Sequence, residues 1–312
     1  MIYIFELYMS ENQKVAVVTG SSTGIGYETS LALANNGYLT YATVRDIQKS
    51  KEIERIAHVK NIPLKIVEMN VDNDNSVKDA IEKITSEYGR IDILVNNAGY
   101  GLFGALEDLE MTEIKKQFET NVFGIIRVIQ NVLPAMRLHR SGIIVNISSI
   151  SGLAGIPSQS AYAGTKFAVE GLSESLSYEL EPFGIKIVLI EPGAINTEFL
   201  QDLVVPTNRY GIDKNKNQIN ISNFNTDNIS FSFYHDTIKK FLSFYYNAMS
   251  IAPHPRIVAD EIIQAIEKVS NETNAMPILR IAVGNDSKKY SRLKKELQDN
   301  EFHKVIRGDL LR

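Results

Sequence analysis

The sequence predicts an α/β fold in which a doubly wound parallel sheet of seven strands carries helices on both faces. Short apolar runs alternate with stretches of helical periodicity along most of the 312 residues, and this alternation is typical of βαβ units. The runs are rich in β-branched residues and apolar throughout, as expected for parallel strands buried on both faces. A glycine-rich turn joins the first run to the first helical stretch, an arrangement that opens many such sheets.

The expected elements follow the chain in order. Apolar runs predict strands at 14–19, 38–44, 64–69, 91–96, 142–148, 185–191 and 279–283. Helical periodicity and cap residues predict helices at 25–36, 46–58, 74–88, 112–139, 159–181, 257–270 and 287–299. We therefore expect one domain over 13–312 that ends in a helical tail at 285–312. Residues 1–12 are interpreted as an N-terminal extension, in which either Met1 or Met9 is the true start.

The pattern breaks down between residues 196 and 255. Residues 211 to 230 carry many asparagines without a clear period, which predicts a long surface loop. A cluster of aromatic residues follows, and so many aromatic side chains are expected to pack over another apolar surface or ligand. Two interpretations stand, a substrate lid over 196–255 lined by these aromatics and a surface for dimer packing. The cluster consists of Phe231, Phe233, Tyr234, Phe241, Phe244, Tyr245 and Tyr246.

The composition excludes several classes of function. The chain is 44% hydrophobic with a net charge of −4, so a large core is available and nucleic acid is not an expected partner. It has no cysteine, which rules out disulfides and thiolate metal sites, and its five histidines lack ligand spacing, so we expect no metal. With no signal peptide and no apolar run near ~18 residues, we expect a cytoplasmic protein without stable membrane insertion.

The glycine-rich turn after the first strand predicts an anion site. Its sequence is Gly20-Ser-Ser-Thr-Gly24-Ile-Gly26, and a helix begins within it. Backbone N–H groups and the positive end of a helix point at a bound phosphate, and glycines let the phosphate approach. Tight packing of helix against strand is the alternative explanation. The candidate binding residues are Gly20, Ser22, Thr23, Gly24, Ile25 and Gly26.

Tyr162 and Lys166 form a candidate proton-transfer pair. Their spacing of four places a phenol and an ammonium on one face of a helix. A free tyrosine has a pKa near ~10, and a lysine one turn away would lower it electrostatically. Ser149, thirteen residues before Tyr162, ends a buried strand and would meet the phenol over a shared substrate oxygen. Turn and cap roles remain the alternative for Ser148, Ser149 and Ser151.

Together these segments resemble the short-chain dehydrogenase/reductase family in its shorter, non-extended branch. The family motifs appear in the expected order and spacing between residues 19 and 193, and the resemblance weakens after about Asn196. The segments 255–262 and 279–284 are similar to the C-terminal part of steroid-, retinol- and lipid-type members. The matching motifs are Thr19-Gly-Ser-Ser-Thr-Gly-Ile-Gly26, Asn96-Asn-Ala-Gly99, Asn121, Ser149, Tyr162-Ala-Gly-Thr-Lys166 and Pro192-Gly193.

The resemblance implies a Rossmann-like fold and further site residues. Asn121, unfavourable inside a helix, would kink the helix and hold a water that connects Lys166 to solvent. Lys166 would also hold the ribose hydroxyls of the cofactor. Asn70 stands where the family usually has an aspartate at the adenine, and asparagine keeps an acceptor. The remaining implied cofactor contacts are Val71, Asn97, Ala98, Gly99, Pro192, Gly193, Ile195 and Thr197, with Thr197 as the carboxamide partner.

Arg45 favours NADP(H) over NAD(H). The second strand ends without the acidic residue that would bind a ribose 2′-hydroxyl, and Arg45 follows at once, where a guanidinium suits a 2′-phosphate. Thr23 is a departure, since many such reductases carry lysine or arginine there. Asp46 adds a nearby negative charge unless it caps the following helix.

We therefore expect an NADP(H)-dependent oxidoreductase that transfers hydride between nicotinamide and a carbonyl or alcohol, with a hydrophobic small-molecule substrate. One alternative is a catalytically silent dinucleotide-binding sensor or scaffold of the same fold. A sugar-nucleotide epimerase of the extended branch is disfavoured by the glycine spacing. Apolar positions on the helices at 112–139 and 159–181 predict a homodimer or homotetramer.

Overall fold

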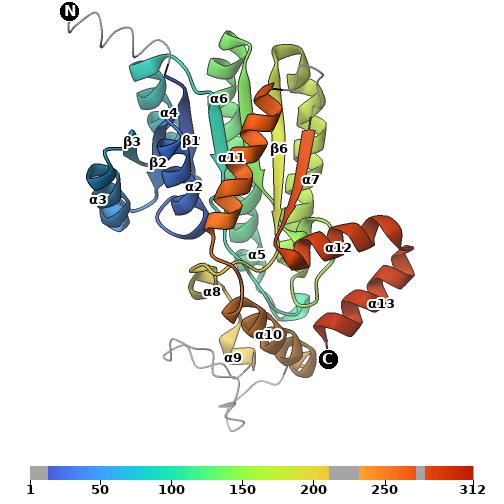
Figure 1. Cartoon of the computed structure of the whole chain (residues 1–312). Coiled ribbons are helices and arrows are strands. Elements are labelled where there is room, and N and C mark those ends of the chain that lie inside the picture. The colour runs from blue at the N-terminus through green and yellow to red at the C-terminus, as the bar shows by residue number, and fades with distance from the viewer. Residues whose placement is uncertain (1–12, 211–231, 272–277, 312) are drawn as a thin grey trace, which may run out of the picture.

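The computed structural model describes residues 13–210, 232–271 and 278–311, and its centre is a seven-stranded sheet (Figure 1). The strands pair in the order β3-β2-β1-β4-β5-β6-β7, and every pair is parallel. The predicted doubly wound α/β fold is confirmed. The strands are β1 (Val15–Val18), β2 (Leu39–Val44), β3 (Leu64–Glu68), β4 (Ile93–Asn96), β5 (Gly142–Ile147), β6 (Ile185–Pro192) and β7 (Ile278–Val283).

Helices cover both faces of the sheet (Figure 1). One face packs against α4 (Asp74–Tyr88), α6 (Gly124–His139) and α7 (Ser160–Leu180). The other packs against α2 (Gly24–Asn35), α3 (Lys51–Lys60) and α11 (Arg256–Asn271). Adjacent residues of β1 alternate between the two cores: Val15 and Val17 belong to the first, and Ala16 and Val18 to the second. This alternation explains why the strands are apolar at consecutive positions.

The helix predicted at 112–139 is not continuous, which corrects the sequence expectation. The structure has α5 (Met111–Phe118), then a π-helical turn (Glu119–Phe123), then α6. The turn contains Asn121, the residue that the family resemblance placed at a kink. A π-helical turn inserts an extra residue without ending the helix, so the run from 111 to 139 is helical throughout but not a single regular α-helix.

Three further helical segments differ from the expectation. The helix predicted at 46–58 begins as a 3₁₀ turn (Ile47–Ser50) before α3. The tail contains two helices where one was predicted, α12 (Asn285–Glu296) and α13 (Asp299–Leu310). Four residues of the aromatic cluster lie on a helix that the prediction missed, α10 (His235–Ser250); they are Phe241, Phe244, Tyr245 and Tyr246. The extension at 1–12 and the loop predicted at 211–230 lie outside the described residues.

The carboxyl ends of all the strands point toward one group of late elements (Figure 1). This group comprises α8 (Phe199–Asp202), α9 (Thr207–Tyr210), α10 and α13, and Figure 1 shows it beyond the end of the sheet. The strand order reverses direction between β1 and β4, and ligands of such sheets bind in the crevice at that switch point. Across the described residues, no helix is long and apolar enough to cross a membrane.

Candidate active site

A cavity of about 710 Å³ opens at the carboxyl ends of the strands. Its walls come from the β1–α2 turn, the ends of β4, β5 and β6, the start of α7, and helices α10 and α13. All but two of the predicted site residues line it; Gly26 and Asn121 lie behind its wall. The predicted residues on the wall are Gly20, Ser22, Thr23, Gly24, Ile25, Arg45, Asn70, Val71, Asn97, Ala98, Gly99, Ser149, Tyr162, Lys166, Pro192, Gly193, Ile195 and Thr197.

The switch point is held together by hydrogen bonds between the ends of β1 and β4. The Thr19 hydroxyl accepts from the backbone N–H groups of Asn97 and Ala98, both at 2.9 Å. In return, the Asn97 side-chain amide donates to the carbonyls of Thr19 and Gly20, at 2.9 and 3.0 Å. These four bonds fix the backbone of the glycine-rich turn against β4. The turn is therefore preorganised before any ligand arrives.

The glycines of this turn leave the space that a pyrophosphate needs. Gly20 and Gly24 have φ of +68° and +60°, which disfavours any residue with a side chain. A Cβ on Gly26 would lie 2.3 Å from the Gly20 carbonyl oxygen and 2.4 Å from the Asn97 amide nitrogen. The absence of a side chain at Gly26 thus lets the Gly20 carbonyl and the Asn97 amide lie close together behind the glycine-rich turn. With α2 starting at Gly24, the residues present fit a dinucleotide phosphate.

At the end of the cavity next to β2, Arg45 is exposed on the wall directly after that strand. Asp46 does not line the cavity, and its carboxylate accepts from the Gln48 N–H at 3.0 Å. It is the N-cap of the following 3₁₀ turn. Of the two roles left open for Asp46, the capping role is the one present, so its charge is directed away from the cavity.

Asp72 is a cavity residue beside Asn70 and Val71 that the sequence reasoning missed. The Asn70 side-chain oxygen accepts from the Asp72 N–H at 3.2 Å, so part of its capacity is used within the loop. Asp72 itself lines the cavity, and its buried Oδ1 has no hydrogen-bond partner among the described residues. The available signal was its position two residues after the strand-ending Asn70.

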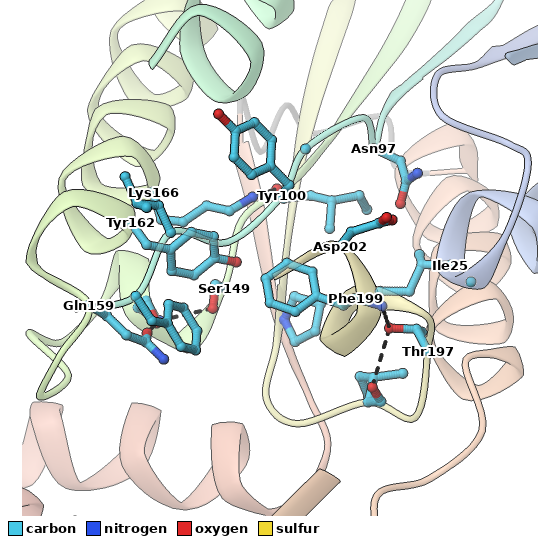
Figure 2. Close-up of a pocket in the computed structure, with 18 of the residues that line it drawn as sticks. Ile25, Asn97, Tyr100, Ser149, Gln159, Tyr162, Lys166, Thr197, Phe199 and Asp202 are labelled. Atoms are coloured by element: carbon cyan, nitrogen blue, oxygen red, sulfur yellow. Dashed lines mark hydrogen bonds between the residues drawn. The ribbon is translucent and has the colours of Figure 1, made fainter. Parts of the chain in front are cut away.

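Tyr162 and Lys166 lie one turn apart at the start of α7, and Ser149 faces them from the end of β5 (Figure 2). All three side chains are buried at the cavity wall. The Lys166 ammonium donates to the Ile147 carbonyl at 2.8 Å and lies 5.7 Å from the centroid of the Tyr162 ring. The structure thus brings the predicted pair and serine together.

Burial is the largest influence on the pKa values of Tyr162 and Lys166. Burial raises the pKa of Tyr162 to about 12, although a hydrogen bond with Ser149 lowers it in part. Burial lowers the pKa of Lys166 to about 8, against the charge of Glu170, which raises it. The expected lowering of the Tyr162 pKa by Lys166 is therefore not present in the protein alone, where the hydrogen bond with Ser149 is what opposes burial. The phenol is protonated at neutral pH and ready to donate.

Asn121 has a structural role that the prediction did not describe. Its side-chain oxygen accepts from the Tyr100 N–H at 3.0 Å, and its amide donates to the Tyr100 carbonyl at 2.9 Å. The same amide donates to the Thr165 hydroxyl at 3.2 Å. Asn121 thereby ties the loop after β4 to the helix that carries Lys166. Because the side chain makes these three bonds, a water relay through Asn121 would use its main chain.

Ser149 has a capping role in addition to its place at the cavity. Its hydroxyl accepts from the Ser151 N–H at 3.1 Å and caps the 3₁₀ turn Ile150–Gly152. The Ser151 hydroxyl donates to Gln159 Oε1 at 2.6 Å, and Gln159 lines the cavity. The cap interpretation and the substrate-facing interpretation are compatible for Ser149. Gln159 is a polar wall residue that the sequence reasoning missed.

The part of the cavity wall that follows β6 is held in place by Asp286, another residue that the sequence reasoning missed. The Ala194 N–H donates to Asp286 Oδ2 at 2.7 Å, and the Gly193 N–H donates to the Val283 carbonyl at 2.9 Å. A Cβ on Gly193 would lie 1.9 Å from Asp286 Oδ1. Only glycine fits at this position, which fixes the turn against the start of α12. The Thr197 hydroxyl accepts from the Phe199 N–H at 3.3 Å, beside the same wall.

Aromatic rings surround Tyr162 on the substrate side. The rings of Phe103 and Phe199 contact that of Tyr162 with centroids 5.8 and 5.9 Å apart. Tyr245 packs on Phe103 at 5.1 Å and on Phe241 at 5.9 Å. Neither Phe103 nor Phe199 belongs to the predicted aromatic cluster. Phe103 comes from the loop after β4 and Phe199 from the start of α8, and nothing in their local sequence marked them.

The predicted aromatic cluster divides between the cavity and the surface. Phe241, Phe244 and Tyr245 line the cavity, whereas Phe233 is 98% exposed. Tyr234 is also exposed, and its hydroxyl donates to Glu107 at 2.6 Å. Tyr246 packs against the aromatic core instead, and Phe231 lies outside the described residues. The lid interpretation of 196–255 thus has geometric support from three of the seven residues.

The model of the short chain dehydrogenase family matches residues 14–206, so the chain belongs to this family. It is an NAD(P)-dependent oxidoreductase acting on CH–OH donors. The chain is 38% identical over 269 residues to the uncharacterized oxidoreductase YusZ of Bacillus subtilis, covering 86% of this chain and 89% of that protein.

Two further comparisons concern function and cofactor. The 3-ketodihydrosphingosine reductase of Bacteroides thetaiotaomicron is 44% identical over 186 residues, which cover 60% of this chain and 65% of that protein. The solved structure of ElxO with NADP bound is 31% identical with a TM-score of 0.64, covering 86% of this chain and 97% of that one.

The glycine cradle makes a testable prediction. We expect Gly26→Ala to lower the free energy of unfolding by ~1–3 kcal/mol and to weaken dinucleotide binding, because its Cβ would push Gly20 and Asn97 apart. Chemical denaturation and titration of NADPH fluorescence measure the two effects. The control is Gly308→Ala within α13, where a Cβ meets nothing within 4 Å and helix propensity favours alanine by up to about 1 kcal/mol. Unchanged affinity in Gly26→Ala would contradict the cradle.

Proposed function

We propose that the protein is an NADP(H)-dependent carbonyl reductase or alcohol dehydrogenase acting on a hydrophobic substrate. One observation carries the proposal: the buried phenol of Tyr162 lies between Ser149, Lys166 and an aromatic pocket, in the same cavity as the glycine cradle. A catalytically silent sensor would have no use for this arrangement. The proton-donating group, the cofactor cradle and a water-poor pocket meet at one place.

The mechanism follows from the protonation states of the residues. When bound, the dinucleotide supplies or accepts the hydride at the carbonyl carbon. The Ser149 hydroxyl donates a hydrogen bond to the substrate oxygen and holds it beside Tyr162. Tyr162, protonated at neutral pH, gives its proton to that oxygen. The Lys166 ammonium then stabilises the phenolate, since the two groups share one face of α7. In the oxidation direction each step reverses.

The remaining cavity residues hold the cofactor. The cradle of Gly20, Ser22 and Gly24 would hold the pyrophosphate, and the loop Asn97 to Gly99 would let the cofactor lie close to the sheet. Asp72, with its unpartnered oxygen, and its neighbours Asn70 and Val71 would hold the adenine, for which the carboxylate offers an acceptor. The turn from Pro192 to Thr197 would hold the nicotinamide. Asn121 acts as a positioning residue, because it fixes the loop after β4 to α7.

Two observations support a hydrophobic substrate. Four aromatic rings line the space next to Tyr162 and leave it little polar surface; they are Phe103, Phe199, Phe241 and Tyr245. The name 3-ketodihydrosphingosine reductase describes a relative that acts on a long-chain keto compound. Apolar contact of this kind contributes about 0.8 kcal/mol for each buried CH₂ group. A carbonyl compound with a substantial apolar body is therefore the best match.

A cofactor-oxidation screen tests the reaction class. We expect the protein to oxidise NADPH in the presence of apolar ketones or aldehydes, and Tyr162→Phe to lower kcat by at least ~10²-fold because the proton donor is lost. The dissociation constant of NADPH should stay nearly unchanged. Tyr178→Phe is the matched control, since Tyr178 is exposed on the same helix. A Tyr162→Phe variant that turns over within a few-fold of the parent would show that the assigned mechanism is wrong.

Cofactor preference is tested at Arg45. Its guanidinium would form charge-assisted hydrogen bonds with the 2′-phosphate, each worth ~1.5–3 kcal/mol. We expect Arg45→Ala to weaken NADPH binding by roughly 10- to 100-fold and to leave NADH binding almost unchanged. Arg55→Ala serves as control, because Arg55 is exposed on α3, pairs with Glu52 and does not line the cavity. Equal losses for NADPH and NADH would mean that Arg45 is structural.

We further propose a homodimer or homotetramer. Apolar side chains remain exposed on the helices that cover one face of the sheet: Leu138 on α6 is 78% exposed, and Phe167 and Tyr178 on α7 are 48% and 64% exposed. Light scattering at micromolar concentration should give a multiple of 35.0 kDa. Phe167→Glu should shift the protein toward the monomer by placing a charge in the contact. A parent protein of monomer mass would contradict the proposal.

A further inference from the structure

Behind the proposed catalytic residues lies a buried ionic cluster that the mechanism above does not use. Glu170 on α7 and Glu191 on β6 are 6% and 2% exposed. Arg280 on β7 forms ion pairs with both carboxylates, and its Nη1 lies 3.5 Å from Glu191 Oε1. Arg280 also bonds the exposed Glu174 at 3.2 Å. One guanidinium therefore serves three carboxylates, two of them removed from water.

The cluster lies directly beneath the site. Glu170 follows Lys166 by four residues, so the two side chains share a face of α7. Glu191 directly precedes Pro192 and Gly193 on the cavity wall. Ser148, which directly precedes Ser149, lies close to Glu170: the point where a Cβ on Gly152 would sit is 2.6 Å from Ser148 Oγ and 3.2 Å from Glu170 Oε1.

The polar atoms of the cluster are only partly satisfied. Glu170 Oε1, Glu191 Oε1 and the Ser148 hydroxyl make no hydrogen bond of good geometry among the described residues. Their nearest interactions are the ion pair of Arg280 with Glu191 at 3.5 Å and a weak contact between Ser148 and Glu170. A buried carboxylate without full hydrogen bonding is costly. Two carboxylates that share one cation disfavour each other's ionisation, so such a pair holds one proton between its members over a range of pH. An arrangement with this cost calls for a role beyond packing.

We propose that Glu170 and Glu191, clamped by Arg280, are positioning residues that keep the Lys166 ammonium charged while the enzyme turns over. This inference rests on the proposed function, in which Lys166 stabilises the phenolate of Tyr162. The Glu170 carboxylate supplies the negative charge behind Lys166. Glu191 adds a second negative charge once the shared proton leaves the pair. The lysine thereby keeps its charge despite its burial.

The protonation of the individual groups agrees with this arrangement. Burial raises the pKa of Glu170, and burial together with the Glu170 charge raises the pKa of Glu191 to about 7. Burial lowers the pKa of Lys166 to about 8, and the Glu170 charge raises it. As pH rises through about 7, the pair becomes more negative and holds the proton on Lys166 more firmly. The other charged groups that face the cluster are Glu174 on α7, Arg280 on β7 and Lys295 on α12.

The test compares three glutamine variants. The pKa of Lys166 is measured by NMR of the protein with isotope-labelled lysine, and Lys166→Met assigns the signal. The kcat for carbonyl reduction is measured across the same pH range. Glu170→Gln should move the Lys166 titration and the alkaline fall in kcat to lower pH by about one unit. Glu191→Gln should move both in the same direction by a smaller amount. Glu174→Gln, an exposed partner of the same arginine, should move neither.

Each outcome decides a different question. Glu170→Asp keeps the charge and should restore most of the parent's pH profile, which a purely structural role would not predict. If the glutamine variants lose thermal stability while the Lys166 titration stays where it is, the cluster is structural and the inference is wrong. If the parent shows no carbonyl reduction at all, the proposed function fails, and the NMR titration still decides whether Glu170 controls Lys166. Should Glu170→Gln not fold, Glu191→Gln and Glu170→Asp give the same decision.

Discussion

The structure depends on how the two halves of the sheet are joined at the switch point between β1 and β4. The chain leaves these two strands in opposite directions, which opens a crevice at their carboxyl ends. Thr19 and Asn97 close that gap with four hydrogen bonds between the two strand ends. Gly20 adopts its φ of +68° without steric strain because it has no Cβ, and the bonds on both sides hold the backbone in that conformation. These hydrogen bonds between β1 and β4 therefore determine the shape of the glycine-rich turn and of the adjacent cavity wall.

A second constraint is the free-energy cost of burying a charged side chain in the protein interior, away from water. Lys166 must be buried to lie beside Tyr162, and burial disfavours its charged form. Two partners counter this cost, the Ile147 carbonyl at 2.8 Å and the Glu170 carboxylate. Glu170 then needs a partner of its own, which is Arg280 on the last strand. The edge strand β7 is thus connected to the proposed chemistry, although it contributes no residue to the cavity wall.

The sequence predicted the fold and most of the cavity wall because both depend on local signals. Continuous apolar runs mark buried strands, and strand-ending glycines, serines and asparagines all fall at one edge of a parallel sheet. What it missed depends on contacts between distant residues. Asp286 reaches Ala194 across 92 positions, and Arg280 reaches Glu170 across 110. No window of sequence contains both partners. The π-helical turn was also missed, because it lies inside a run without a helix-ending glycine or proline between Met111 and Phe123, so no signal in the sequence marks an interruption of the regular helix there.

The aromatic pocket and the proton donor are physically coupled. Phe103 and Phe199 contact the Tyr162 ring edge to face, and the water that they exclude is the reason that burial raises the pKa of Tyr162. An aromatic residue removed to admit a larger substrate would also admit water to the phenol. The pKa of Tyr162 would then fall toward its ordinary value, since desolvation is the main cause of its rise. Phe103 and Phe199 therefore bear on both the size of the substrate and the acid strength of Tyr162, whereas Phe241 and Phe244 line the cavity without a ring contact to Tyr162.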